Sequence, residues 1–278
     1  TTTTLTGTAP FNVVFDASGT TATGVSKPFR HLFYVWDFGD DQSTYWANGA
    51  YVNQNKNTEY GPIASHVFQN SGSKTVTLYV YDGSGNVATQ TFTVTVNAAD
   101  SVYSGTNTIV FSTSGTFTGK PTGAQEVTTS SLNTAMTYRA ANKRLLFRAG
   151  ETWTAATSAV TDINVSGMQI GKFSTGADPI WSIPDTGSLW GVRVGADAGA
   201  TGLTMYDIDM EGGNGVNNLG FAGVGSIDNV LFLRCKANGF SNGASFPKGS
   251  VEGTTAHKIW DNLAFVDCTI DVINNSVG

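Results

Sequence analysis

Short runs of β-branched and aromatic residues alternate along the whole chain with glycine, asparagine, aspartate and serine, and long helical periodicity is hard to find. Within residues 75–81, Val76, Leu78 and Val80 fall on one face of an extended strand and threonine and tyrosine on the other. This strand is expected to cover residues 74–81, and further strands are expected at residues 11–16, 32–38 and 88–96. The pattern therefore predicts an all-β chain, whose first part has the strand spacing of a small β-sandwich.

The second part of the chain contains an internal repeat. Residues 228–235 (DNVLFLRC) match residues 261–268 (DNLAFVDC) at an offset of 33. Residues 203–209 (LTMYDID) match residues 230–236, which overlap the first of these, at an offset of 27. Matched strands at unequal offsets are typical of a solenoid whose successive turns carry insertions of different length.

The composition narrows the class of partner. The net charge is −6, and charged residues make up only 13% of the 278 residues, so few cations are available to neutralise phosphates. Nucleic acid and anionic membrane surfaces are therefore not expected as partners, and no apolar run approaches the roughly 20 residues of a spanning helix. We expect a mature or excised segment of a secreted protein, located outside the cell or on its surface.

Four motifs occur in order within the first part: residues 9–18 (APFNVVFDAS), 35–40 (VWDFGD), 66–68 (HVF) and 71–78 (SGSKTVTL). Together they resemble a PKD (polycystic kidney disease) domain. The resemblance implies an immunoglobulin-like β-sandwich over residues 1–97, with Trp36 and Phe38 in or near its core. Two features depart from the family: Asp41 stands where glycine is usual, and residues 41–65 are longer than usual.

After a short linker at residues 98–103, residues 143–153 (KRLLFRAGETW) resemble the first coil of a right-handed parallel β-helix of the pectate-lyase-like superfamily. The predicted β-helix covers residues 104–278, with an entry and cap segment at 112–140. A solenoid needs a capped end, and none is evident, so we expect the β-helix to be incomplete at its C-terminus or covered by a partner. The superfamily includes lyases, hydrolases, tailspikes and passive adhesins, so the resemblance indicates architecture and not chemistry.

Charged residues at alternate positions of the repeat are expected on one outward face. Asp207 and Asp209 fall on one coil, Arg234 and Lys236 on the next, and Asp267 on the third. The resemblance to lyases implies a Ca²⁺ site at Asp207, Asp209 and Asp267, with Arg234 or Lys236 as the catalytic base. The alternative is cross-strand charge pairing without metal or catalysis.

Strict alternation also predicts which uncharged residues face inward. It places Ile208, Cys235 and Cys268 in one inward column, where the two thiols are either small hydrophobic groups or a disulfide. A second inward column is expected at residues 206, 233 and 266. Met205, Phe232 and Phe265 then form an outward apolar ladder, covered by a loop or used for assembly with another subunit or with the sandwich.

The long insertion carries aromatic residues that could stack on sugar rings: Tyr45, Trp46, Tyr51 and Tyr60. The alternative is that they pack the insertion onto its own sandwich. Two hypotheses for function follow. The first is an extracellular protein that binds an acidic polysaccharide on the β-helix and, in its enzymatic version, cleaves it as a polysaccharide lyase or glycoside hydrolase. The second is a non-catalytic structural or adhesive surface protein that assembles into a fibre or filament, through self-association or as part of a longer chain.

Overall fold

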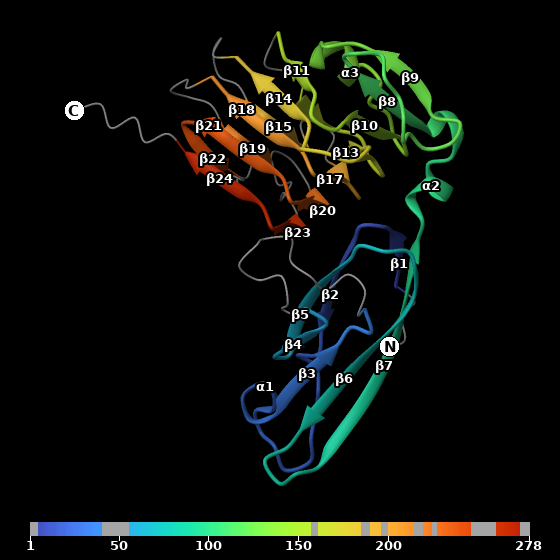
Figure 1. Cartoon of the computed structure of the whole chain (residues 1–278). Coiled ribbons are helices and arrows are strands. Elements are labelled where there is room, and N and C mark those ends of the chain that lie inside the picture. Colours follow the sequence, from blue (N-terminus) through green and yellow to red (C-terminus); the bar gives the residue numbers. More distant parts are fainter. Residues whose placement is uncertain are drawn as a thin grey trace, which may run out of the picture. The chain divides into compact units, whose positions relative to one another are not determined.

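The computed structural model describes residues 5–40, 56–156, 161–184, 190–195, 200–213, 219–223, 227–245 and 260–272 (Figure 1). Strands account for 53% of the residues and helices for 8%, and several sheets are parallel, so the prediction of an all-β chain is confirmed. The chain divides into two compact units, Thr1–Val102 (unit 1) and Tyr103–Gly278 (unit 2).

Unit 1 consists of two sheets and two short helices. Its elements are β1 (Leu5–Thr8), β2 (Phe11–Asp16), α1 (Pro28–His31), β3 (Phe33–Asp37), β4 (Thr58–Tyr60), β5 (Ile63–Phe68), β6 (Gly72–Tyr81), β7 (Val87–Asn97) and α2 (Ala99–Val102). One sheet has the order β1-β7-β6-β3-β4, and the other pairs β2 with β5. Neighbouring strands are antiparallel except for the parallel pair β1 and β7.

The two sheets of unit 1 share one core, to which alternate residues of each strand contribute. Trp36 is 1% exposed, and its indole Nε1 donates a hydrogen bond to the carbonyl oxygen of Gly61 at 2.8 Å. The Trp36 ring lies 5.3 Å from that of Phe15 on the facing sheet. In β6, Val76 and Leu78 are buried as the alternation predicts. Large aromatic side chains therefore fill the space between the sheets.

Unit 2 is built almost entirely from parallel strands. Its elements before the regular stack are η1 (Gly105–Asn107), β8 (Thr108–Ser112), β9 (Gln125–Thr128) and α3 (Leu132–Met136). The strands that follow are β10 (Arg144–Arg148), β11 (Thr152–Thr154), β12 (Asp162–Ile163), β13 (Gln169–Phe173), β14 (Ile180–Ile183), β15 (Trp190–Val194), β16 (Ala200–Thr201), β17 (Thr204–Tyr206), β18 (Asp209–Gly212), β19 (Leu219–Gly223), β20 (Ile227–Leu233), β21 (Lys236–Phe240), β22 (Asn242–Ser245), β23 (Trp260–Val266) and β24 (Thr269–Val272).

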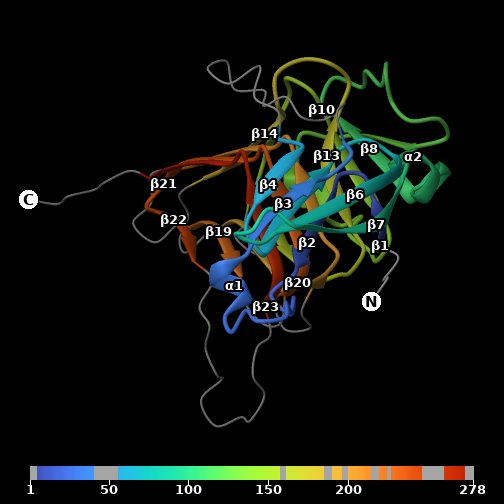
Figure 2. The same cartoon turned by 90° about the horizontal axis from the view of Figure 1, so that it is seen from below.

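From β10 onward the chain visits three sheets in turn, and we call each pass a coil. The first sheet contains β10, β13, β17, β20 and β23, together with β8, β9 and β16. The second has the order β11-β14-β18-β21-β24, and the third β12-β15-β19-β22. Figure 1 and Figure 2 show strands from successive coils lying side by side within these sheets. Each coil thus contributes strands to these sheets in turn, and each strand lies parallel to the equivalent strand of the coil before it.

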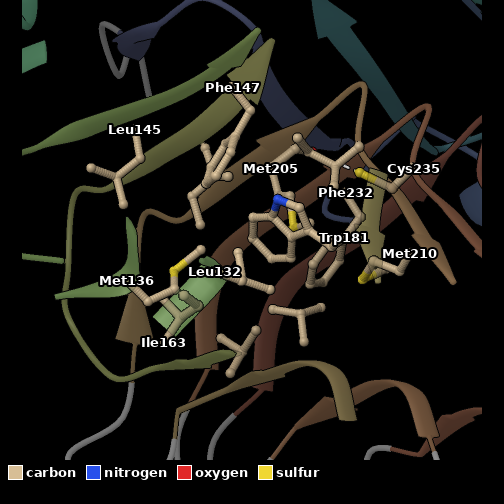
Figure 3. Close-up of a cluster of buried hydrophobic side chains, with 14 of the residues drawn as sticks. Leu132, Met136, Leu145, Phe147, Ile163, Trp181, Met205, Met210, Phe232 and Cys235 are labelled. Atoms are coloured by element: carbon tan, nitrogen blue, oxygen red, sulfur yellow. Dashed lines mark hydrogen bonds between the residues drawn. The ribbon is translucent and has the colours of Figure 1, made fainter. Parts of the chain in front are cut away.

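The interior of unit 2 contains a hydrophobic cluster to which side chains from all three sheets contribute (Figure 3). Phe147, Trp181 and Met205 are each 0% exposed, and the Phe147 and Trp181 rings pack edge to face at 5.2 Å. Leu132 and Met136 of α3 are buried in the same cluster. The side chain of Ser131 accepts a hydrogen bond from the backbone N–H of Thr134, which caps the start of α3.

A left-handed backbone conformation recurs in five successive coils. It lies two residues before a set of register neighbours in the first sheet. The register runs Arg144, Gln169, Thr204, Leu231 and Ala264. The residues two positions earlier all have positive φ: Asn142, Gly167, Gly202, Asn229 and Asn262, at 59°, 66°, 71°, 52° and 50°. Glycine and asparagine adopt this left-handed conformation most easily. The repeat therefore fixes a corner as well as a strand.

The outward apolar ladder expected at Met205, Phe232 and Phe265 faces inward instead. These residues are register neighbours, but Met205 and Phe232 are 0% exposed in the core. Phe265 stacks on Phe232 with ring centroids 4.9 Å apart and is 37% exposed. The predicted facing is wrong, and no seam for assembly follows from Met205 and Phe232.

A second left-handed corner explains the error. Asp207, Arg234 and Asp267 have φ values of 54°, 52° and 54°, so the alternation of faces breaks between each first-sheet strand and the next. Ile208 and Cys235 therefore face inward as predicted, and so do the residues three positions before them. Tyr206, predicted to face inward, instead packs with a cluster containing Val110 and Leu146. This cluster lies on the other side of the first sheet.

Candidate functional site: the outer charge ladder of unit 2

Charged side chains line the outer side of the corner between the first and second sheets. Asp207, Arg234 and Asp267 occupy equivalent corner positions on three successive coils. Two residues later, Asp209, Lys236 and Thr269 are register neighbours in β18, β21 and β24. We call the charged residues of these two columns, together with Lys172 and Asp178, the charge ladder. The structure thus brings all the predicted catalytic and metal-binding residues to one surface.

Arg234 forms a two-pronged ion pair with the coil before it. Its Nε lies 2.6 Å from Oδ1 of Asp207, and its second guanidinium nitrogen lies 3.1 Å from Oδ2. The two side chains are 27% and 16% exposed, so both are largely withdrawn from water. Burial alone would lower the pKa of Arg234, but hydrogen bonds and charge from Asp207, together with the charge of Asp267, raise it.

Lys236 is held by two carboxylates. Its Nζ lies 2.9 Å and 3.0 Å from the two oxygens of Asp209 and 3.3 Å from Asp178. Asp178 also accepts a 2.6 Å hydrogen bond from Lys172. Burial opposes ionisation of Asp178, but the two lysines outweigh it and lower the pKa of Asp178. Burial also opposes the charged form of Lys236. Its hydrogen bonds to Asp209 and Asp178 and their charges outweigh burial and raise the pKa of Lys236.

These contacts limit the chemistry that the charge ladder can perform. A general base must lose its proton near the operating pH, and the pKa values of Arg234 and Lys236 are both shifted upward, which favours their charged forms. Asp207 and Asp209 already have a cation within hydrogen-bond distance. Among the residues that the structure describes, no three His, Cys, Asp or Glu side chains are grouped to hold a metal ion. The observed contacts are those of the cross-strand pairing alternative.

Of the aromatic residues proposed for sugar stacking, the structure describes Tyr60, which ends β4 and is 60% exposed. Tyr45, Trp46 and Tyr51 lie outside the described residues. The Tyr60 ring lies 5.8 Å from that of Phe33, whose own ring lies 6.3 Å from Tyr81. Sequence reasoning did not select Phe33 and Tyr81. The available signal was their position on the face of the strands opposite the core.

Sequence reasoning also missed a buried polar cluster in unit 1. The carboxylate of Asp40 is 0% exposed and lies 2.6 Å from Nζ of Lys74 and 3.0 Å from Nε2 of His66. The His66 ring stacks on Phe38 at 4.4 Å. These contacts join the chain after β3 to β5 and β6, which belong to different sheets. The complete burial of Asp40 indicates a structural tie between the sheets.

The two cysteines are free thiols on adjacent coils. Cys235 is fully buried, and its Sγ lies 3.5 Å from the carbonyl oxygen of Met205. Burial raises the pKa of Cys235 well above its usual value. At the half-buried Cys268, a hydrogen bond from Cys235 lowers the pKa and outweighs the effect of burial. We therefore expect Cys268 to be the more reactive of the two thiols.

No protein-family model matches the chain, and no curated protein matches it. Within the described residues, none of the helices is both long and apolar enough to cross a membrane.

Proposed function

We propose that this chain is a non-catalytic structural or adhesive module that acts outside the cell or on its surface. Unit 2 is its rigid scaffold, and unit 1 is a β-sandwich carried on the same chain. The observation that carries the proposal is the charge ladder, in which Arg234 and Lys236 are paired with Asp207 and Asp209 of the preceding coil. Such pairs hold neighbouring coils together and leave neither cation available as a base.

The finer architecture is part of the same proposal. We infer that unit 2 is a parallel β-helix, since its chain passes repeatedly through three parallel sheets. The right hand is expected because crossovers between parallel strands are right-handed in nearly all cases. For unit 1, the burial of Trp36 and Phe38 supports an immunoglobulin-like sandwich of the PKD kind.

The second candidate is a protein that binds a polysaccharide. The exposed rings of Phe33, Tyr60 and Tyr81 favour it, since an apolar surface open to solvent suggests a binding role. Cleavage of an acidic polysaccharide on unit 2 is less well supported. It would require Arg234 or Lys236 to leave its ion pair and lose a proton. Ca²⁺ would also have to compete with these cations for Asp207 and Asp209.

The test is a turnover assay on the full chain. Polygalacturonate is incubated with the protein and Ca²⁺, and the ultraviolet absorbance of unsaturated products is followed together with the release of reducing ends. We expect neither signal to exceed a protein-free control. Turnover that disappears in Arg234→Gln or Lys236→Met, while the far-ultraviolet circular dichroism stays unchanged, would establish an enzyme and overturn the proposal.

A further inference from the structure

A strip of exposed apolar side chains crosses the outer face of the larger sheet of unit 1. Phe33 is 57% exposed, Tyr60 60%, Tyr81 37% and Val87 52%. They come from four neighbouring strands, β3, β4, β6 and β7. We call these four residues the aromatic strip. Large apolar groups left in water are costly, so a contiguous set of them calls for an explanation.

The strand register places the strip on a single face. Phe33 lies opposite Tyr81, and Tyr81 lies opposite Val87. Tyr60 lies opposite Val35, which is two residues from Phe33 and therefore on the same side of β3. The other residues of β3 that alternate with these, Tyr34 and Trp36, point into the core. The strip is thus a consequence of strand alternation and not of a disordered loop.

The rings form a twisted platform. Phe33 lies between the two tyrosines, with ring centroids 5.8 Å from Tyr60 and 6.3 Å from Tyr81. The Phe33 ring is inclined by 30° to Tyr60 and by 47° to Tyr81. The three neighbouring rings thus form a continuous apolar row. Its twist suits a single chain that rotates between units better than the flat surface of a crystal.

The outward face around the strip is polar, and the basic residues that precede Phe33 in the chain, Lys27, Arg30 and His31, belong to the start and body of α1 and not to the sheet. Tyr79 lies opposite Thr89, and Thr77 lies opposite Thr91, so hydroxyl groups continue the same face. The outward positions of β3, β4, β6 and β7 carry no lysine or arginine in the part of the chain that the structure describes. Their carboxylate Asp37 is engaged with the backbone N–H of Gly39 and with Asn57. An anionic ligand would therefore find no counter-charge on the outward positions of these four strands.

We propose that the aromatic strip binds one uncharged polysaccharide chain whose sugar rings stack on Phe33, Tyr60 and Tyr81. Pyranose rings have apolar C–H faces that match aromatic rings and hydroxyl edges that can bond to the tyrosine and threonine hydroxyls. The absence of lysine and arginine from the outward positions of these four strands favours an uncharged chain over uronates, sulfated sugars and phosphates. The inference rests on the second candidate function, polysaccharide binding, and names the class of polysaccharide and the residues that would bind it.

The experiment measures binding of the full chain to hydroxyethylcellulose and to mixed-linkage β-glucan by affinity gel electrophoresis and calorimetry. We expect both to bind and polygalacturonate not to bind. Phe33→Ala, Tyr60→Ala and Tyr81→Ala should each weaken binding about tenfold, as is usual for an aromatic anchor. Tyr60→Phe and Tyr81→Phe retain the ring and should change binding by no more than about twofold.

Val14→Ala is the matched control, since Val14 is 47% exposed on β2 of the other sheet and should have no effect. Thermal unfolding of each variant confirms that it is folded. The inference is overturned if neither glucan binds, if the tyrosine-to-alanine variants bind as well as the wild type, or if Phe33→Ser turns a dimer into a monomer, which would make the strip a contact between copies. Those results leave the turnover assay of the scaffold proposal unaffected.

Discussion

Trp36 combines two stabilising contacts in one side chain, since its ring packs against Phe15 of the facing sheet and its indole nitrogen bonds to Gly61. Trp36→Ala should lower the free energy of unfolding of unit 1 by about 3–5 kcal/mol, because it leaves a large cavity and an unpaired carbonyl. Trp36→Phe, which keeps part of the packing, should lose less. Chemical denaturation followed by tryptophan fluorescence and circular dichroism measures both. An unchanged transition for Trp36→Ala would contradict the burial of this side chain.

The thiols of Cys235 and Cys268 offer a test based on pH. Because the pKa of Cys268 is lowered by its hydrogen bond from Cys235, its thiolate should persist to lower pH than that of an ordinary cysteine. Iodoacetamide should therefore modify Cys268 well before Cys235, whose pKa is raised by burial. Cys235→Ala removes the hydrogen bond and should move the pH profile of Cys268 alkylation to higher pH. Peptide mass spectrometry reads out both sites, and equal rates at the two cysteines would contradict the arrangement.

In unit 2, a left-handed corner recurs on five successive coils, two residues before register-matched positions of the first-sheet strands. Asn229 occupies this corner with φ 52°, and its side chain accepts a 2.7 Å hydrogen bond from Asn262 of the next coil. Asn229→Ala should lower the free energy of unfolding by about 1–2 kcal/mol, because alanine disfavours the left-handed conformation. Asn229→Gly loses the same side-chain contact but tolerates the angle, so it should be the more stable variant in thermal unfolding. The reverse order would contradict the corner.

Adjacent coils are also joined by the pair of Arg234 with Asp207. Arg234→Gln leaves a largely buried carboxylate without its cation and should lower the free energy of unfolding of unit 2 by about 1–2 kcal/mol. Asp207→Asn should have a similar cost. The double variant should lose about 1 kcal/mol less than the sum of the two, which measures the coupling of the pair. Strict additivity in urea denaturation would show that the two side chains do not interact.

The strands were predictable from the sequence, but the direction of some side chains was not. Hydrophobic alternation located the strands, because burial of one face imposes a period of two. The match between residues 228–235 and 261–268 located the repeat. The left-handed residues Asp207, Arg234 and Asp267 break that period. Neither aspartate nor arginine indicates a left-handed conformation in a sequence as clearly as glycine does. Extending the alternation across the corner therefore turned Met205 and Phe232 outward, whereas their side chains lie in the core.

The candidate site was predictable to a similar extent. The same residues, Asp207, Asp209, Arg234 and Lys236, were selected from the repeat, and their cross-coil pairing was one of the two alternatives. Asp178 and Lys172 belong to no repeated motif, so their ion pairs in the charge ladder could not be predicted from the repeat. The aromatic strip was not predictable either, because its four residues come from β3, β4, β6 and β7, which are neighbours in the sheet although β5 separates two of them from the others along the chain.

For the whole molecule, the central claim is that the charge ladder is a structural feature and not a Ca²⁺-dependent catalytic site. Thermal unfolding of the full chain with Ca²⁺ or with a chelator tests it most directly. A ligand that binds only the native state raises the melting temperature in proportion to ln(1 + [L]/Kd), so a Ca²⁺ site would be visible in the wild type. We predict the same melting temperature under both conditions, and a loss of at most about 1 kcal/mol for Asp209→Asn. A Ca²⁺-dependent increase that Asp209→Asn abolishes would contradict the claim.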